Sequence, residues 1–402
     1  VTADELPGYF EALGASFLER FDAARLAVEV GPLWDLDRTW GAFDGGRSVG
    51  TYRSWATEIT VPGGDRLPAG AVTVVSVLPT HRRRGILRAM MATDHAASRE
   101  RGEAMALLFA AEYPIYGRFG YGVGTRHATW TLDTRTTGFV GDRSGSIELV
   151  KPDDQIATTL AEVHETWRIG HAGEIRRPAH RWGYDVGLIE SAWGGRWKGY
   201  LALHRDASGI VDGYVRYTTE QKWEQSQPRG VVTVNELIGL TDGAYAALWS
   251  FLTNIEWAAS AKAEGRPLGE RLPWLLTNAR AAAISDVVDG LWVRLFDIPL
   301  ALSSRTYERE ARVVLEVVDA EAAGGRVRVV LDASAGGATC RVTEASPDLT
   351  LDVSALGAAY LGGTRLTDAV VAHGADEHRP GSLREADALF RTFDAPWCST
   401  FF

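Results

Sequence analysis

The stretch that most constrains the fold runs from Val72 to Arg88 and reads VTVVSVLPTHRRRGILR. Its first half, residues 72–77, is β-branched and apolar, which predicts a strand buried on both faces. Pro79 ends that strand, because proline has no N–H to donate to a ladder. A helix is predicted to begin at about Arg84, because apolar residues then recur at helical spacing, namely Ile86, Leu87, Met90 and Met91.

A basic loop, His81-Arg82-Arg83-Arg84-Gly85, joins the predicted strand to the predicted helix. The free N–H groups of a first helical turn and the helix dipole together favour a bound anion. Gly85 would let the backbone approach a phosphate that a Cβ would obstruct. Cations are unfavourable at a helix N-terminus unless an anion meets them, so a functional loop is favoured over a solvated charge run.

The length, composition and net charge of the chain limit the class of protein. At 402 residues the chain is too long for one ordinary domain, and two or three domains are expected. Apolar residues make up 46% and charged residues 23%, which is typical of a soluble globular protein. The net charge of −10 argues against general nucleic-acid binding and favours cationic partners.

The N-terminal segment, the longest apolar run and the cysteines and histidines indicate the cellular location and whether a metal is bound. The N-terminus, VTADELPGYF, has no basic n-region and no apolar h-region, so no secretory signal is visible and a cytoplasmic protein is expected. The longest apolar run, 104–111, is too short to span a membrane. Two cysteines fit a reducing compartment, and histidines such as His81 and His95 form no metal-binding set, so no metal is predicted.

The basic loop also fits the pattern R-x-x-G, with Arg82 first and Gly85 fourth. Together with the preceding V-x-V strand it resembles the acetyl-CoA pyrophosphate loop of the GNAT family of N-acetyltransferases. The order of predicted elements resembles the GNAT fold as well: helices within 1–32, a hairpin around Asp44-Gly45-Gly46, the Val-rich strand, the loop, a helix and a buried strand at 104–111.

The pattern of the first domain recurs further along the chain. A hairpin is predicted around Asp206-Ala-Ser-Gly209, followed by a Val-rich strand at 231–234 and a helix from about Ala244. The corresponding turn reads Leu240-Thr-Asp242-Gly243, with an acid where a phosphate would need cations. Residues 147–289 are therefore interpreted as a second GNAT-like domain without a coenzyme site, against the alternative that such hairpins recur by chance.

From about Leu291 the pattern changes. Strands are predicted at 313–318 and 326–331, followed by a strand at 349–353 and a helix at 354–360. This last region resembles the sterol-carrier-protein fold, and the resemblance implies no bound lipid.

Tyr116 stands in Tyr116-Gly-Arg-Phe-Gly120-Tyr121, one strand after the basic loop. In GNAT enzymes the tyrosine at this place gives a proton to the departing thiolate of coenzyme A. A phenol with a pKa of about 10 stays protonated at neutral pH and can act as that acid. The alternative is a core tyrosine with a satisfied hydroxyl, and the spacing favours Tyr116 as the acid and Tyr121 as the structural residue.

PTHRRRGILRAM, IYGRFGYG, the second GNAT-like region and the tail together make the whole chain resemble the Eis (enhanced intracellular survival) family of N-acetyltransferases. The resemblance implies an α+β protein of two tandem GNAT-like α/β domains and a sterol-carrier-like domain, with boundaries at 1–146, 147–289 and 290–402. It also implies acetyl-CoA as co-substrate, acetylation of aminoglycoside or lysine amines, and a homohexamer built as a trimer of dimers.

The resemblance assigns site residues in the first domain. Tyr116 is implied as the general acid. The coenzyme contacts implied are the strand edge, the loop and helix start, and the end of the next strand: Val75, Ser76, Val77, Arg83, Arg84, Gly85, Ile86, Leu87, Arg88, Ala111 and Glu112. Candidates to line an acidic, open acceptor cavity are the acids Glu19, Asp35, Asp37 and Glu112 and the aromatic residues Phe17 and Trp34.

The chain ends Ala395-Pro-Trp-Cys-Ser-Thr-Phe401-Phe402, which is unusually apolar for a terminus. In the family the carboxylate of the last residue is the general base, and here that residue is Phe402. If both phenylalanines are buried, the carboxylate moves inward and becomes a better base. Simple hydrophobic docking with a surface carboxylate is the alternative. Family members carry an acid at the penultimate position, where this chain has Phe401.

These observations lead to the hypothesis of an acetyl-CoA-dependent N-acetyltransferase that acts by direct attack on amines of aminoglycosides or similar polyamines. The alternative is a non-catalytic GNAT scaffold that binds coenzyme A or a protein partner. The intact R-x-x-G loop and Tyr116 favour the enzyme.

Overall fold

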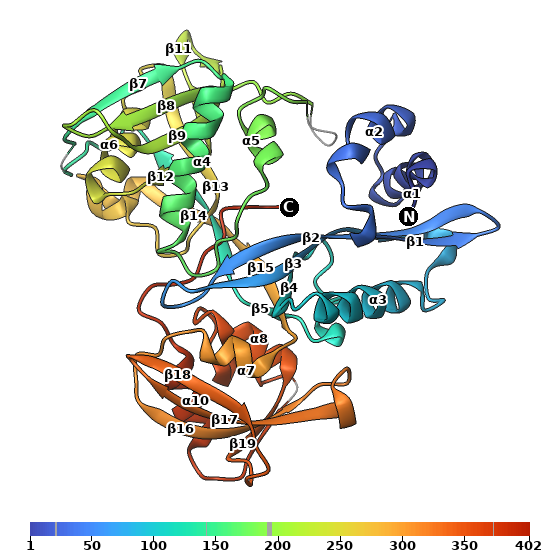
Figure 1. The fold of residues 1–402 in the computed structure, drawn as a ribbon. Helices are drawn as coiled ribbons and strands as arrows, with labels where there is room; N and C mark the ends of the chain where they lie inside the picture. The colour runs from blue at the N-terminus through green and yellow to red at the C-terminus, as the bar shows by residue number, and fades with distance from the viewer. Residues whose placement is uncertain (21, 142, 191–194, 373) are drawn as a thin grey trace. The chain divides into compact units, whose positions relative to one another are not determined.

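The Val-rich stretch lies in β3 (Arg66–Val77), within a six-stranded sheet of order β1-β2-β3-β4-β15-β5 (Figure 1). The computed structural model describes every residue except 21, 142, 191–194 and 373. The remaining strands of this first sheet are β1 (Thr39–Asp44), β2 (Arg47–Thr60), β4 (Met105–Phe109), β5 (Gly122–Val123) and β15 (Leu291–Leu295). β3 and β4 pair in parallel, and parallel strands need a crossover connection. The long helix α3 (Ile86–Glu100) is that connection.

Two helices precede the first sheet, within residues 1–32, where one or two helices are predicted. They are α1 (Leu6–Phe17) and α2 (Ala23–Glu29). The core between the first sheet and α3 is built from apolar residues of both, and it includes both tyrosines of the YGRFGY motif: Tyr52, Val72, Met90, Met91, Ala106, Leu108, Tyr116, Tyr121 and Trp292.

A second, five-stranded sheet of order β18-β17-β16-β19-β20 is formed by the C-terminal part of the chain. Its strands are β16 (Ala311–Val318), β17 (Arg326–Ser334), β18 (Gly337–Val342), β19 (Leu349–Asp352) and β20 (Ala375–Glu377). Its helices are α7 (Ile298–Ser303), α8 (Val353–Tyr360), α9 (Leu366–Ala369) and α10 (Ser382–Phe390). Together with Val1–Thr125 this part, Gly290–Phe402, forms one unit of the structure.

The other unit, Arg126–Asp289, contains a seven-stranded sheet of order β14-β6-β13-β12-β9-β8-β7. The strands are β6 (Arg126–Asp133), β7 (Ser146–Val150), β8 (Tyr200–Arg205), β9 (Val211–Glu220), β12 (Gly230–Gly239), β13 (Ala258–Arg266) and β14 (Ala282–Asp289). The helices are α4 (Asp154–Arg168), α5 (Ala179–Asp185) and α6 (Asp242–Thr253), and a two-stranded ribbon is made by β10 (Trp223–Glu224) and β11 (Gln227–Pro228).

Strand pairing crosses both boundaries expected from the sequence. β6 precedes residue 146, yet it pairs with β13 and β14 in the sheet of the second unit. β15 follows residue 289, yet it lies between β4 and β5 in the first sheet. Each sheet therefore contains a strand from beyond the expected limit of its sequence segment, because a buried strand pairs wherever its two edges find partners.

Candidate functional site

The basic loop connects β3 to the N-terminus of α3, as the sequence predicts. Arg82, Arg83, Arg84 and Arg88 are all exposed. Arg83 and Gly85 both have left-handed backbone angles, with φ of 63° and 79°. A Cβ built on Gly85 would point into open space, so the missing side chain leaves room beside the backbone there.

The N-terminus of α3 has no side chain that caps its N–H groups. These donors and the positive end of the helix dipole are therefore available to an anion beside the exposed arginines. Of the loop arginines, Arg84 donates to the Thr80 carbonyl oxygen at 3.2 Å, which holds the loop in a turn. The arrangement fits a diphosphate group in both charge and hydrogen-bonding capacity.

Next to this loop the first sheet opens. β3 and β4 pair in parallel only along 69–71 and 105–107, and both strands continue past this register. Val74 has a positive φ of 49°, and the register between β2 and β3 shifts near it. The diverging strands leave residues 73–77 half-buried. The expectation of a strand buried on both faces is therefore wrong for these residues, because β4 does not cover their edge.

The opened strand edge presents the backbone of Val75, Ser76 and Val77. The side chain of Ser76 turns toward β2, where its hydroxyl lies 2.7 Å from the Thr51 hydroxyl. The Ser76 side chain is thus engaged by β2. The main-chain N–H and C=O groups on the β4 side can pair with a peptide-like arm of a ligand.

Tyr116 lies beyond the end of β4 in the core beneath the opening. Its side chain is 7% exposed and packs edge-on against Tyr121, with ring centroids 6.0 Å apart, and against Trp292 at 6.4 Å. Burial, with a smaller contribution from the Glu112 carboxylate, raises the pKa of Tyr116 to about 12. The phenol therefore keeps its proton at neutral pH.

Ala111 and Glu112, the two further contacts expected from the sequence, are both exposed just after β4. The Glu112 carboxylate lies 4.0 Å from the Arg82 guanidinium of the basic loop. This long, exposed pair brings the segment after β4 next to the basic loop.

The chain terminus lies against the end of β4. The Phe402 ring stands edge-on to Phe109 with centroids 5.2 Å apart and to Trp55 at 5.6 Å. Phe401 also contacts Phe109, at 4.9 Å between centroids. The sequence analysis named Phe401 and Phe402 from the apolar tail, but it did not single out Phe109 or Trp55, because no local signal connects them to the tail.

Burial of both terminal phenylalanines was the condition for a carboxylate carried inward, and Phe401 does not meet it. The tail is buried through Trp397, Cys398 and Thr400, but Phe401 is 65% exposed and Phe402 is half-buried. The tail is therefore anchored by the residues before Phe401, and the last two side chains stay partly accessible to solvent.

The candidate residues for an acidic acceptor cavity are partly engaged elsewhere. Asp35 accepts from the Asp37 backbone N–H at 3.0 Å and pairs with Arg38 at 3.5 Å. The Arg53 guanidinium lies over the Trp34 ring, 4.6 Å from its centroid. Trp34 also packs against Phe10, so it acts as part of the core of the N-terminal helices.

In the second unit, the helix start and the strand edge that correspond to the coenzyme site are occupied by protein side chains. The N-terminus of α6 is capped by Thr241, whose hydroxyl accepts from the Ala244 N–H at 3.1 Å. Past the parallel pairing of β12 with β13, the Arg266 guanidinium donates to the Leu237 carbonyl oxygen at 2.9 Å and to Glu270. A protein side chain therefore occupies the place where the first sheet is open, which agrees with the missing basic loop.

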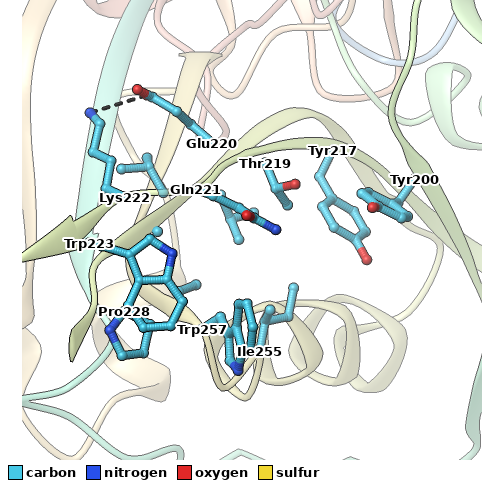
Figure 2. Close-up of a pocket in the computed structure, with 14 residues that line it drawn as sticks. Tyr200, Tyr217, Thr219, Glu220, Gln221, Lys222, Trp223, Pro228, Ile255 and Trp257 are labelled. Atoms are coloured by element: carbon cyan, nitrogen blue, oxygen red, sulfur yellow. Dashed lines mark ion pairs between the residues drawn. The ribbon is translucent and has the colours of Figure 1, made fainter. Parts of the chain in front are cut away.

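A separate aromatic groove, with an internal volume of about 200 Å³, lies on the second unit (Figure 2). Tyr200 stacks on Tyr217 with centroids 5.4 Å apart at one end, and Trp223 stands edge-on to Trp257 at 5.4 Å at the other. Lys222 pairs with Glu220 at its rim, as Figure 2 shows. Its residues belong to no motif of the coenzyme site.

Among the residues that the structure describes, no cluster of three or more histidine, cysteine or acidic side chains has the arrangement of a metal site. None of the helices in the same residues combines the length and the apolar character that crossing a membrane requires.

Comparison with known proteins decides the family. Residues 1–124 and 173–295 each match a model described as an acetyltransferase (GNAT) domain, and residues 298–399 match a sterol carrier protein domain. The chain is 33% identical to N-acetyltransferase Eis of Mycobacterium tuberculosis over 413 residues, which covers 100% of this chain and 98% of the relative. The chain belongs to the Eis family of GNAT N-acetyltransferases.

Other relatives agree with this assignment. An uncharacterised N-acetyltransferase of Streptomyces griseus is 42% identical over 417 residues, which covers 100% of this chain and 98% of the relative. The crystal structure of Eis1 from Mycobacterium abscessus matches with a TM-score of 0.86 at 34% identity, covering 100% of this chain and 98% of that one. The predicted fold class, two GNAT domains and a sterol-carrier-like domain, is confirmed, and this member of the Eis family is an N-acetyltransferase whose GNAT domains imply acetyl-CoA as co-substrate.

Proposed function

We propose that this Eis-family protein transfers the acetyl group of acetyl-CoA to primary amines of aminoglycosides or similar polyamines, or to lysine side chains. The observation that carries the proposal is the contact of Phe402 with Phe109 at the end of β4. Phe109 is the last residue of β4, and the chain runs on from it to Tyr116. The contact therefore supports the proposal that the terminal carboxylate and Tyr116 act at one opening of the sheet.

In the proposed reaction the terminal carboxylate of Phe402 takes a proton from the substrate ammonium group. The free amine then attacks the thioester carbonyl carbon directly, forming a tetrahedral intermediate and no acetyl-enzyme. As the C–S bond breaks, the Tyr116 hydroxyl gives its proton to the sulfur. The attacking nitrogen loses its second proton through solvent to the Tyr116 phenolate, which restores the phenol, and the carboxylate releases its own proton to solvent. The protein contributes mainly by holding amine and thioester together, with backbone N–H groups of the strand and loop to polarise the carbonyl.

The residues proposed to hold the co-substrate are those of the opened edge and the basic loop. Val75, Ser76 and Val77 offer main-chain partners, and the arginines and free N–H groups at the start of α3 match a diphosphate. Ala111 and Glu112 flank the reacting end. The proposed binding of the diphosphate depends on the exposed loop arginines and the uncapped N–H groups of α3.

Two observations support a cationic acceptor. The chain carries a net charge of −10, and Glu112 is exposed beside the proposed site. The exposed Phe401 ring offers a surface on which a sugar ring can stack. The homohexamer that the resemblance implies stays a prediction, which light scattering on the purified chain checks.

Thiol release from acetyl-CoA with kanamycin as acceptor tests the proposal. We expect release that depends on both substrates and acetylated kanamycin in the mass spectrum. The alternative function, a GNAT scaffold that only binds coenzyme A or a partner, is favoured if coenzyme A binds but no amine, lysine peptides included, gives release above background.

A further inference from the structure

Behind Tyr116, a buried hydrogen-bonded chain connects the first domain to the C-terminal domain. The His95 side chain on α3 is completely buried, and its Nε2 lies 3.0 Å from the Tyr121 hydroxyl. Its Nδ1 lies 2.9 Å from Glu321, a residue of the loop between β16 and β17. Tyr121, His95 and Glu321 therefore form a continuous chain that crosses from the core beneath the active site into the C-terminal domain.

The charges around Glu321 fix the direction of these hydrogen bonds. Arg99 donates to the Glu321 carboxylate at 2.8 Å and Arg294 at 3.2 Å. Although burial acts in the opposite direction, the hydrogen bond from His95 and the neighbouring arginines lower the pKa of Glu321 to about 2. An ionised carboxylate only accepts hydrogen bonds, so Nδ1 of His95 carries the proton that faces it.

Arg99 and Arg294 both contact the Glu321 carboxylate, and Arg294 also donates to Asp319 at 2.7 Å. With the His95 proton on Nδ1, Nε2 is the ring nitrogen that can accept from the Tyr121 hydroxyl. Burial raises the pKa of Tyr121 well above its ordinary value, so its hydroxyl has a proton to donate to Nε2. The orientation of the Tyr121 side chain thus depends on a carboxylate contributed by the C-terminal domain.

The backbone beside Tyr121 is held by the same domain. Gly120 has a φ of 82°, and a Cβ there would come within 2.9 Å of the Val353 side chain of α8. A Cβ on Gly122 would overlap the Ser354 carbonyl oxygen and the Ala358 nitrogen of α8. The glycines that flank Tyr121 in the YGRFGYG motif therefore permit the C-terminal domain to pack directly on the segment that carries both tyrosines.

We propose that His95 and Glu321 are positioning residues for the acetyl-transfer reaction: Glu321 orients His95, His95 orients Tyr121, and the Tyr121 ring holds the catalytic Tyr116 by their edge-on contact. The inference rests on the proposed role of Tyr116 as acid. It gives the C-terminal domain a second task in the reaction, separate from supplying the terminal carboxylate. None of the side chains of Glu321, His95 and Tyr121 has to touch either substrate.

The competing explanation is that the pair only fastens the C-terminal domain to the first domain. Both explanations predict some loss of stability when the pair is cut. Only the positioning role predicts that the loss of kcat requires Tyr116. A double-mutant comparison therefore separates the two explanations.

The experiment measures kcat, and KM for acetyl-CoA, with kanamycin as acceptor in Glu321→Gln and Tyr121→Phe. Each change is made in the full-length protein and again in Tyr116→Phe. We expect kcat to fall about tenfold in the first background with KM nearly unchanged, as for a small misplacement of a catalytic group. In Tyr116→Phe, where the acid is absent, the same changes should lower kcat no further.

Matched variants and a folding check make the result specific. Glu316→Gln removes a carboxylate that pairs with Arg328 inside the C-terminal domain, and Tyr307→Phe removes a buried hydroxyl that donates to the Leu302 carbonyl oxygen; both should leave kcat unchanged. His95→Gln keeps a donor and an acceptor and should retain more activity than His95→Leu. Thermal unfolding of every variant confirms that it is folded at the assay temperature.

Each outcome decides a different point. If Glu321→Gln and Tyr121→Phe lower kcat by the same factor in both backgrounds, or leave it unchanged in the first, the positioning inference is overturned while the proposed function stands. If Tyr116→Phe alone has full kcat, the proposed acid is wrong and the inference falls with it.

Discussion

The Phe402 ring meets the Phe109 ring edge-on with centroids 5.2 Å apart, so the last residue of the chain contacts the last residue of β4. Trp55 is the third ring of this contact, with its centroid 5.6 Å from that of Phe402. If the terminal carboxylate acts as proposed, the packing of these apolar rings helps to position it.

If that carboxylate is the base, residues appended after Phe402 should lower kcat by about 100-fold, because the charge is moved from its place. Coenzyme affinity should stay nearly the same. A sharper variant converts the terminal carboxylate to an amide by semisynthesis, which removes the charge and keeps the Phe402 ring. The same extension placed before Val1 is the control, and a fully active C-terminal fusion would exclude the carboxylate as base.

Tyr116→Phe should lower kcat by about 100-fold, because the leaving thiolate loses its proton donor, with KM for acetyl-CoA nearly unchanged. Turnover assays with Tyr307→Phe as control check this. The pH profile gives a second reading. The protonated phenol is the active form, and the pKa of Tyr116 is raised to about 12, so activity due to this group is lost only as the pH rises toward 12. A loss of activity near pH 8 that disappears in Tyr116→Phe would contradict the buried environment that raises the pKa of Tyr116.

Arg83→Glu combined with Arg84→Glu should abolish coenzyme A binding, because two cations at an uncapped helix N-terminus become anions. Isothermal titration calorimetry with coenzyme A measures the loss. Arg280→Glu with Arg341→Glu makes the same change in net charge outside the loop and should leave the affinity intact. Normal binding by the loop variant would show that the diphosphate lies elsewhere.

Phe401→Glu should lower KM for kanamycin relative to the parent protein, because an acid beside the terminal carboxylate attracts a polycation. The gain should shrink at high salt, since the position is exposed and its charge is screened. KM for a small monoamine acceptor should change less. Equal KM values for kanamycin in both proteins at low salt would show that Phe401 does not face the acceptor.

Arg266→Met should destabilise the second unit by about 3–5 kcal/mol, because it leaves the buried Glu270 carboxylate without its cationic partner, although the Tyr245 hydroxyl still donates to it. Chemical denaturation followed by tryptophan fluorescence measures the change. Coenzyme A should still bind with one site per chain, since α6 keeps its Thr241 cap and has no arginine run. A second site in the calorimetric titration would show that the Arg266 side chain alone had closed it.

The sequence predicted the local elements well. The strand, basic loop and helix around Gly85 were recognisable because each has a distinct period or a turn residue of its own. Tyr116 and the apolar tail were also visible as motifs. The predicted roles of these residues stay predictions until the variants above are measured.

The long-range pairings were not predictable from local pattern. β15 pairs with β4 across a gap of more than 150 residues, and nothing in Leu291–Leu295 indicates which sheet it joins. The bond between His95 and Glu321 spans 226 positions, and a lone histidine on a helix indicates no partner. Such contacts depend on how whole layers pack, which a single sequence does not encode in its neighbouring residues.

The place of β15 between β4 and β5 has a consequence for how the protein is made. During synthesis the first sheet must wait for a strand that leaves the ribosome only after the whole second unit has emerged. Until then one edge of β4 is unpaired and open to wrong partners. A fragment that ends before residue 291 should accordingly be prone to aggregate, however complete its coenzyme loop.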